Sequence, residues 1–240
     1  MNDRIIWEPI RKVKAHVQAL EQIEEQILNG TLRSGSKLPS ERDLAAMLDV
    51  SRPSVREALR ALGVLGIVDS NPGSGEDSGS VISNRTGESL AVLIQLSVAL
   101  SNIGMAELVD VRVKLEQRAA YRAAARRTEV DIAEIWDTVE RMHQAGEDPA
   151  QLSALSADFH LQVARASGNR LIIDLVEALR SASRAGMDEV VGDPVNWSQF
   201  SHALTMEHTD IFNAIEAGDG ETAAKLIGSH ISRFYEDRVC

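Results

Sequence analysis

Apolar residues at helical spacing appear early in the chain and are separated by short polar breaks. Over residues 16–29 they recur every three or four positions, and Gly30 follows as a stop signal, so we expect a first helix there. Ser40 with Asp43 forms an N-cap pair that predicts a second helix over residues 41–48. The pattern therefore begins with two short helices joined by a Gly, Ser and Pro-rich connection.

A third helix is predicted after the break "LDVS". Ser51 is its N-cap candidate, Pro53 is tolerated in the first turn, and the helix ends near Leu62 or Leu65. Helical spacing sorts its residues into two neighbouring stripes, an apolar one of Val55, Ala58, Leu59 and Leu62, and a basic one of Arg52, Arg56 and Arg60. The β-prone pieces "IVDS" and "SVIS" then flank a Gly and Ser loop, so we expect a hairpin and, overall, a winged helix-turn-helix.

From about Thr86 the pattern is helical almost to the end of the chain. About seven apolar-periodic segments are bounded by Gly, Asn, Asp or Pro, with no repeat of fixed period. We therefore expect a mainly α protein, with a winged helix-turn-helix domain over residues 1–85 and an all-α helical bundle over residues 86–240.

Charge separates the two parts. The formal net charge is −11, yet residues 1–66 hold ten Lys or Arg against nine Asp or Glu, which leaves −12 on the remainder.

The only cysteine is Cys240, so no intrachain disulfide or cysteine-based metal site is available. No apolar run could span a bilayer and no secretion signal is evident, so we expect a cytoplasmic protein with no membrane partner.

The basic stripe has two interpretations. A helix face carrying arginines is often simply solvated, here paired with Glu57 and other carboxylates. On the second helix of a helix-turn-helix, in the one segment that is not acidic, the same arginines are placed to contact guanine edges and phosphates in a major groove. This position favours double-stranded DNA as the partner.

The motifs "LPSERDLA" and "VSRPSVREALRAL" closely resemble the DNA-binding domain of the GntR family of bacterial transcription regulators. The resemblance implies DNA contacts at Arg42, Ser51, Arg52, Ser54 and Arg56. In the wing, the family usually has a short Gly and Thr turn, whereas this chain has Glu76 and Asp77. Those carboxylates would be repelled by phosphates, so the tip either turns away or contacts DNA through backbone N–H groups of glycines such as Gly75.

The helical half resembles the effector domain of the FadR-like subfamily, the FCD type, at "VRVKLEQRAAYRAA", "DFHLQVARASGN", "EHTDIFNAIEAGD" and "AAKLIGSHI". The resemblance implies a homodimer that binds a palindromic operator, usually as a repressor, and that responds to a small carboxylate effector. Effector binding would change operator affinity by about 1 to 3 kcal/mol.

The same resemblance implies a divalent metal, such as Zn²⁺, held by His160, His208 and His230. The family's fourth ligand, an aspartate one turn before the first histidine, is replaced by Ser156, and Asp158 projects to a different side. Three imidazoles with water can still hold such an ion, though without the carboxylate the site is expected to be weaker or empty. If Ser156 marks a pocket without metal, a larger ligand, such as an acyl compound, is favoured.

Arg112 matches a position where the family often has an arginine that pairs with the effector carboxylate, so Arg112 and Ser156 are candidate effector contacts. A salt bridge from Arg112 to Glu116, four residues on, is an equal alternative. The rival class is a metal-binding helical-bundle enzyme. A di-iron enzyme of this class needs two Glu-x-x-His motifs, but the sequence has one, at Glu140 and His143. No phosphate loop or catalytic triad pattern is present either.

Overall fold

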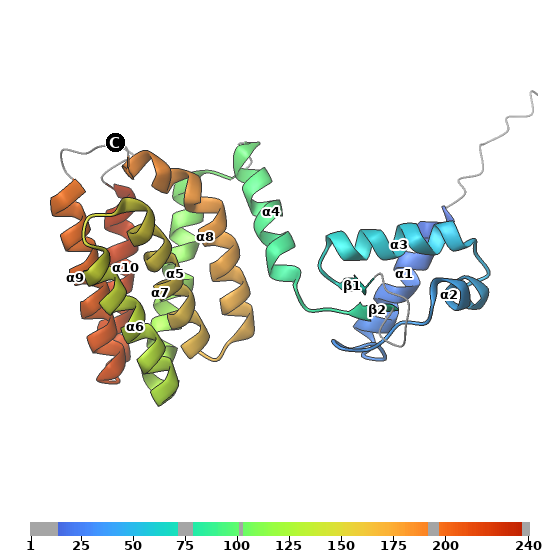
Figure 1. The fold of residues 1–240 in the computed structure, drawn as a ribbon, viewed down its shortest axis with the longest axis horizontal. Helices are drawn as coiled ribbons and strands as arrows, with labels where there is room; N and C mark the ends of the chain where they lie inside the picture. The colour runs from blue at the N-terminus through green and yellow to red at the C-terminus, as the bar shows by residue number, and fades with distance from the viewer. Residues whose placement is uncertain (1–13, 72–78, 101–102, 192–196, 237–240) are drawn as a thin grey trace, which may run out of the picture. The chain divides into compact units, whose positions relative to one another are not determined.

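The computed structural model describes residues 14–71, 79–100, 103–191 and 197–236 (Figure 1). The chain divides into two compact units, Met1–Ser89 and Leu90–Cys240. None of the described helices is long and apolar enough to cross a membrane. Each unit has its own buried core.

The first unit contains three helices around a small apolar core. They are α1 (Ala15–Leu28), α2 (Glu41–Met47) and α3 (Arg52–Val64), within two residues of the predicted bounds. The predicted caps are confirmed, because the Ser40 side chain accepts a hydrogen bond from the Asp43 N–H and Ser51 accepts one from the Ser54 N–H. The predicted apolar stripe of α3 is buried in this core together with residues of α1 and α2, among them Ile23 and Leu44.

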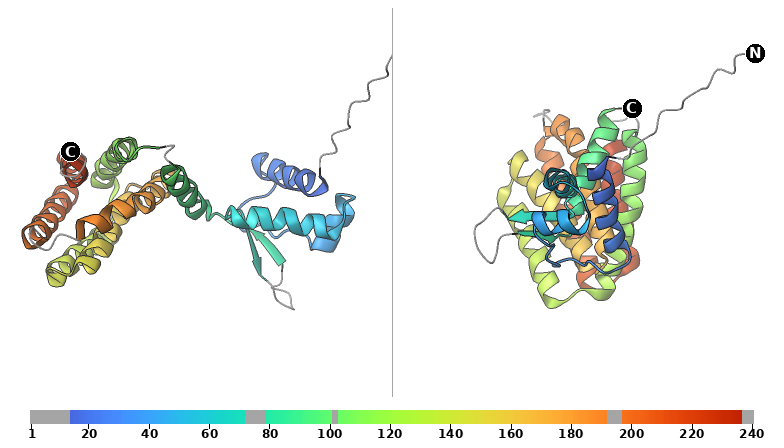
Figure 2. Two further views of the ribbon diagram at one scale, coloured as in Figure 1. Left: turned by 90° about the horizontal axis from the view of Figure 1, so that it is seen from above. Right: turned by 90° about the vertical axis from the view of Figure 1, so that its right-hand side faces the viewer.

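Strands β1 (Val68–Asn71) and β2 (Gly79–Ile82) complete this unit as an antiparallel pair, seen side by side in Figure 2. Val68 lies opposite Ile82, and both are buried in the same core as the helices. The predicted hairpin is therefore confirmed. Gly75, Glu76 and Asp77, at the expected wing tip, lie outside the described residues.

Two backbone positions set the turns of the first unit. Asp49, between α2 and α3, has φ 51°, a left-handed conformation that Asp tolerates better than most residues. Gly66, between α3 and β1, has φ 68°, and a Cβ there would lie 2.5 Å from the Arg85 carbonyl oxygen. A larger residue at Gly66 would therefore force apart the segments that lead into β1 and into the following helix.

The second unit is helical. Two of its helices begin with side-chain caps. Thr128 and Asp131 cap each other, and the Asp148 side chain accepts hydrogen bonds from the Ala150 and Gln151 N–H groups ahead of a helix that begins at Pro149. The helices after β2 are α4 (Thr86–Ala99), which begins within the first unit, and then α5 (Met105–Arg126), α6 (Glu129–Ala145), α7 (Pro149–Ala166), α8 (Arg170–Val191), α9 (Trp197–Glu216) and α10 (Gly220–Glu236).

Helix α5 is the centre of this bundle, because it packs against α7, α8, α9 and α10. Figures 1 and 2 show α10 beside α5 and α9, and α7 beside α6 and α8. The main apolar cluster takes residues from α5, α6, α7, α9 and α10, including Phe159 and Ile211. The predicted fold class, a winged helix-turn-helix followed by an all-α bundle, is confirmed.

Candidate functional site

The first candidate surface is the outer face of α3. Its apolar stripe is buried, whereas Arg52, Arg56 and Arg60 are exposed along the neighbouring face. Ser51 and Ser54 lie at the helix start, where their hydroxyl oxygens are 2.8 Å apart. The N-terminal turn of α3 therefore presents hydroxyls and guanidinium groups together on a face that the core does not use.

Arg56 is held by a carboxylate of the preceding helix. Two of its guanidinium nitrogens donate to Glu41 of α2, at 3.0 to 3.2 Å. This hydrogen bond is the main reason that the pKa of Glu41 lies below its ordinary value and that of Arg56 above. The carboxylate expected to balance the stripe, Glu57, instead lies 3.1 Å from His16 of α1. The pair with Glu41 joins α2 to α3 and limits the directions in which Arg56 can point.

Arg42, in the first turn of α2, is the most exposed of the predicted DNA contacts that take part in an ion pair. Its side chain is 79% exposed, and its Nε lies 3.3 Å from the neighbouring Asp43. Such an exposed pair contributes little stability and leaves the guanidinium able to move. Arg42 lies on α2, and Arg52 and Arg56 lie on α3, so the predicted DNA-contacting residues are divided between the two helices.

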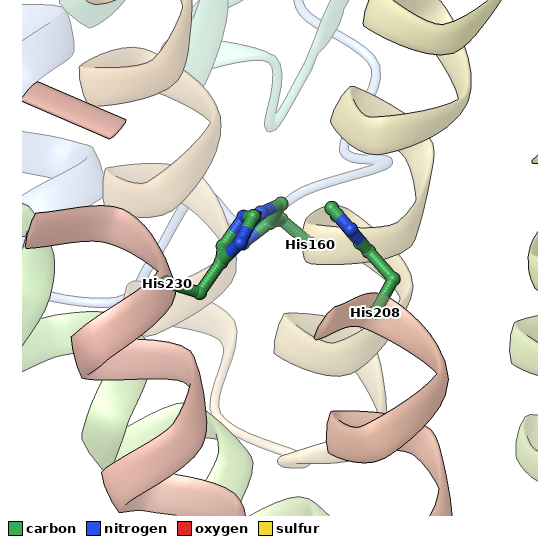
Figure 3. A group of neighbouring side chains, drawn as sticks. All are labelled: His160, His208 and His230. Carbon is green, nitrogen blue, oxygen red and sulfur yellow. The ribbon is translucent and has the colours of Figure 1, made fainter. Parts of the chain in front are cut away.

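The second candidate site is a group of three histidines in the helical unit. His160 of α7, His208 of α9 and His230 of α10 are buried, and Figure 3 shows their rings turned toward one another. One ring nitrogen from each lies within 4.8 Å of the others. The tertiary fold thus brings together the three histidines predicted from sequence, which are 48 and 22 positions apart.

Each ring is oriented by an acceptor on its other nitrogen. The Nδ1 atom of His160 contacts the Glu116 carboxylate, Nδ1 of His208 lies 2.7 Å from the Leu204 carbonyl oxygen, and Nδ1 of His230 lies 2.7 Å from the Glu207 carboxylate. These oxygens can only accept, so the Nδ1 atoms carry the hydrogens. The Nε2 atoms consequently present lone pairs, as is usual for metal-binding histidines whose outer nitrogen is hydrogen-bonded.

The spacing of the Nε2 atoms suits a small ion. Those of His160 and His230 are 3.3 Å apart. Two nitrogens bound to one tetrahedral Zn²⁺ at about 2.0 to 2.1 Å lie roughly 3.3 to 3.4 Å from each other. Two facing lone pairs at this distance repel each other unless a cation or a proton lies between them. The three side chains therefore suit a divalent ion in ligand type, in the spacing of their ring nitrogens and in tautomer.

Ser156 occupies the position of the fourth ligand expected in the family. It is buried on α7, and its hydroxyl oxygen lies 3.2 Å from Nε2 of His208, to which it can donate. Asp158 is exposed on another side of α7, as its spacing predicts, and does not join the histidines among the described residues. The site thus offers three imidazole nitrogens and a hydroxyl, and in the part of the chain that the structure describes no carboxylate belongs to the group.

Burial keeps the imidazoles of His160 and His208 uncharged. It is the largest cause that lowers the pKa of His160 to about 3, against the opposing pull of Glu116, and that lowers the pKa of His208 well below its ordinary value. Burial alone would raise the pKa of Glu116, but Arg112 and then His160 hold that pKa below its ordinary value. Neutral imidazoles are the form that binds metal.

Arg112 forms the salt bridge to Glu116 that is one of its two interpretations. Its Nε lies 2.6 Å from Glu116, its Nη1 lies 3.5 Å from the Ser183 hydroxyl, and both side chains of the ion pair are almost fully buried. The guanidinium neutralises the carboxylate that orients His160. The orienting roles of Glu116 and Glu207 could not be found from sequence, because nothing in the local pattern links Glu116 to His160, 44 positions away.

The fold and these two sites define a class, a DNA-binding transcription regulator with a helical C-terminal domain. Residues 16–76 match the family of bacterial regulatory proteins of the gntR type, and residues 107–233 match the FCD domain. The chain belongs to the GntR family, with an FCD domain.

Several relatives match over nearly their whole length. The chain is 32% identical to the HTH-type transcriptional regulator LutR of Bacillus subtilis, over 89% of this chain and 99% of that protein. It is 29% identical to the transcriptional repressor NanR of Klebsiella aerogenes (93% and 85%) and 30% identical to the Glc operon transcriptional activator of Escherichia coli (88% and 84%).

Two solved structures are similar to this chain in fold. A GntR protein of Streptococcus agalactiae aligns with a TM-score of 0.59 at 25% identity, covering 91% of this chain and 98% of that one. E. coli McbR/YncC aligns with a TM-score of 0.51 at 20% identity, over 94% and 99%, which shows the shared fold. These relatives are transcription regulators, so the alternative of a helical-bundle enzyme is rejected.

Proposed function

We propose that this regulator is a repressor that binds a palindromic operator as a homodimer, and that a small carboxylate bound in the helical unit changes its operator affinity. A two-fold dimer presents two copies of α3 to two half-sites about one helical turn apart. NanR of Klebsiella aerogenes bears the name of a repressor, and the E. coli Glc protein that of an activator. Relatives of both kinds exist, so an experiment must test whether this regulator represses the genes behind its operator.

The exposed arginine stripe supports the DNA part of the proposal. Arg52 and Arg56, near the start of α3, are in the turn that enters a major groove in helix-turn-helix proteins, with Arg42 on the helix before them. Arginine grips guanine O6 and N7 with two hydrogen bonds, and a wrong base at such a position costs about 1 to 3 kcal/mol. We assign base contacts to Arg52 and Arg56, and phosphate contacts to Ser51 and Ser54.

The convergence of three buried Nε2 atoms supports the effector part. We propose that His160, His208 and His230 hold a divalent ion, with Ser156 or water beside it. A bound ion would supply positive charge and an open coordination position for a carboxylate oxygen. The chain's own contribution is to fix the rings through Glu116, Leu204 and Glu207 and to bury them.

The DNA assignment is tested by selecting fragmented host genomic DNA on the purified protein and sequencing what is retained. Fluorescence anisotropy at fixed salt then compares the recovered operator with variants. Arg52→Ala should weaken binding by about 1 to 3 kcal/mol, whereas Arg141→Ala, which removes an exposed arginine of α6, should leave it unchanged. An Arg52→Ala protein that binds its operator like the wild type contradicts the assignment.

The metal assignment is tested on protein purified without chelator. We expect close to one equivalent of a transition metal per chain, lost in His208→Ala. Less than about a tenth of an equivalent, with no Zn²⁺ uptake on titration, contradicts it. The sign of regulation follows from a reporter gene placed behind the recovered operator, whose expression should rise when the regulator is deleted.

A further inference from the structure

The three arginines of the α3 stripe differ in their surroundings. Arg56 is paired with Glu41 of α2, whereas Arg52 and Arg60 form no ion pair within the part of the chain that the structure describes. The hydrogen bond from Arg56 is the largest cause of the lowered pKa of Glu41, and the charges of Arg52 and Arg60 add to it. Glu41 therefore lies in the field of the whole stripe but is hydrogen-bonded to one member of it.

The pair between Arg56 and Glu41 uses one side of the guanidinium group. Nε lies 3.2 and 3.1 Å from the two carboxylate oxygens, and Nη2 donates to one of them at 3.0 Å. A guanidinium has five N–H groups, so the two on Nη1 and one on Nη2 can still donate elsewhere. Guanine O6 and N7 together accept two hydrogen bonds from one arginine. Arg56 can therefore bind a guanine and Glu41 at the same time.

Glu41 is suited to hold the longer side chain in place. It is the first residue of α2, directly after the Ser40 N-cap, where the exposed N–H groups of the first turn stabilise a negative charge. Its side chain is 33% exposed, against 46% for Arg56. Glu57, the neighbour of Arg56 in sequence, is 62% exposed and pairs with His16 instead. The chain thus provides one carboxylate that orients Arg56 and an adjacent one that does not.

An oriented arginine discriminates between bases better than a mobile one. A mobile guanidinium can turn from a base edge to a phosphate oxygen, and a phosphate contact carries no sequence information. A guanidinium that is held before binding also loses less side-chain entropy when it meets its base. The carboxylate beside it lowers the local positive charge, which weakens non-specific attraction to phosphates. All three effects favour the specific complex over the non-specific one.

We propose that Glu41 is a positioning residue for base recognition, which directs Arg56 to a guanine edge and makes the base preference of Arg56, unlike that of Arg52, depend on a second residue. This inference rests on the proposed function, in which Arg52 and Arg56 both contact bases. It assigns part of the sequence specificity to a carboxylate on the helix before the reading helix.

The experiment uses the full chain and the operator recovered from genomic DNA. Duplexes in which each operator base pair is changed in turn are measured by fluorescence anisotropy at fixed salt, with a scrambled duplex as the non-specific reference. Arg56→Ala and Arg52→Ala each identify the base pair that the arginine reads, because the preference at that base pair is lost. We expect Glu41→Gln to reduce the preference at the base pair of Arg56 about fivefold or more, and to leave that at the base pair of Arg52 within about twofold.

Glu57→Gln is the matched control, because it removes the same charge beside Arg56 in sequence without removing the partner of its guanidinium. Both variants lose one negative charge, so both should bind the scrambled duplex at least as tightly as the wild type does. Glu57→Gln should leave the preference at both base pairs within about twofold. A retained preference at the base pair of Arg52 also shows that α3 of Glu41→Gln is folded and docked.

The proposal is overturned if Glu41→Gln keeps the preference at the base pair of Arg56, if it loses the preference at both base pairs alike, or if Glu57→Gln loses as much. In each of these cases Arg56→Ala still loses the preference at one base pair, so the proposed function stands. An Arg56→Ala protein that loses affinity for all duplexes alike contradicts the base contact assigned to Arg56 in the proposed function, and it overturns this inference as well.

Discussion

Replacing Glu116 with glutamine tests how the buried ion pair supports the histidine group. Glu116 is 1% exposed and serves two partners, because it accepts from Arg112 at 2.6 Å and contacts Nδ1 of His160. Glutamine has nearly the same shape, but it carries no charge and has one acceptor oxygen instead of two. Glu116→Gln therefore leaves the Arg112 charge buried without a counter-charge in the position of the carboxylate.

The expected magnitude follows from that burial. Removing one partner of a buried ion pair typically destabilises a protein by about 3 to 5 kcal/mol, whereas replacing both partners with neutral residues of similar size is often close to neutral. We therefore expect Glu116→Gln to lose about 3 kcal/mol or more, and the double variant Arg112→Met/Glu116→Gln to regain most of it. Loss of the acceptor that orients His160 should weaken Zn²⁺ binding about 10- to 100-fold in both variants.

The two effects are measured separately. Urea unfolding followed by tryptophan fluorescence reports mainly on the helical unit, because Trp136 and Trp197 lie in α6 and at the start of α9. Zn²⁺ affinity is measured by competition with a chromophoric chelator. Glu140→Gln, at an exposed position of α6, is the matched control and should change neither quantity.

Two results would refute this reasoning. A single variant that loses less than about 1 kcal/mol would mean that the buried Arg112 charge does not need Glu116. A double variant that binds Zn²⁺ as tightly as the wild type would mean that His160 does not need this carboxylate to hold its orientation.

Two further outcomes are expected. The pKa of Glu41 is lowered from its ordinary 4.5, mainly by the hydrogen bond from Arg56, so this pair stabilises the first unit above pH 4.5 and the stabilisation is lost as the pH falls through the lower, folded-state pKa. Glu41→Gln should remove that part of the acid dependence of thermal unfolding. The same change of melting temperature with pH in the variant and the wild type contradicts this prediction. Chelating the metal should lower the melting temperature of the wild type but not of His208→Ala, because a ligand that binds only the folded state stabilises it; equal melting curves with and without chelator argue against a bound ion.

The elements of the first unit could be predicted because their signals are local. Ser40 and Ser51 each cap a backbone N–H three residues ahead, and the apolar stripe of α3 repeats within single helical turns. Even so, the partner of Arg56 could not be predicted. Glu57 is adjacent in sequence, but Glu41, 15 positions earlier, is the carboxylate that α2 places against the guanidinium.

The histidine group was predicted only through its resemblance to a family. Spacing alone gives no reason for residues 160, 208 and 230 to meet, because α7, α9 and α10 are separate helices whose packing depends on the whole apolar core. The competing interpretations of Arg112, effector contact or ion pair, were equally compatible with the sequence. The burial of Arg112 beside Glu116 favours the ion pair.

The helical segments, the turns, the hairpin and the helix with exposed arginines could all be predicted from the sequence, because caps and periodicity act within a few residues. The contacts between side chains that are distant in sequence depend on the tertiary fold. Glu116 contacts His160, and ring nitrogens of His160, His208 and His230 lie within 4.8 Å of one another, because α5, α7, α9 and α10 pack together.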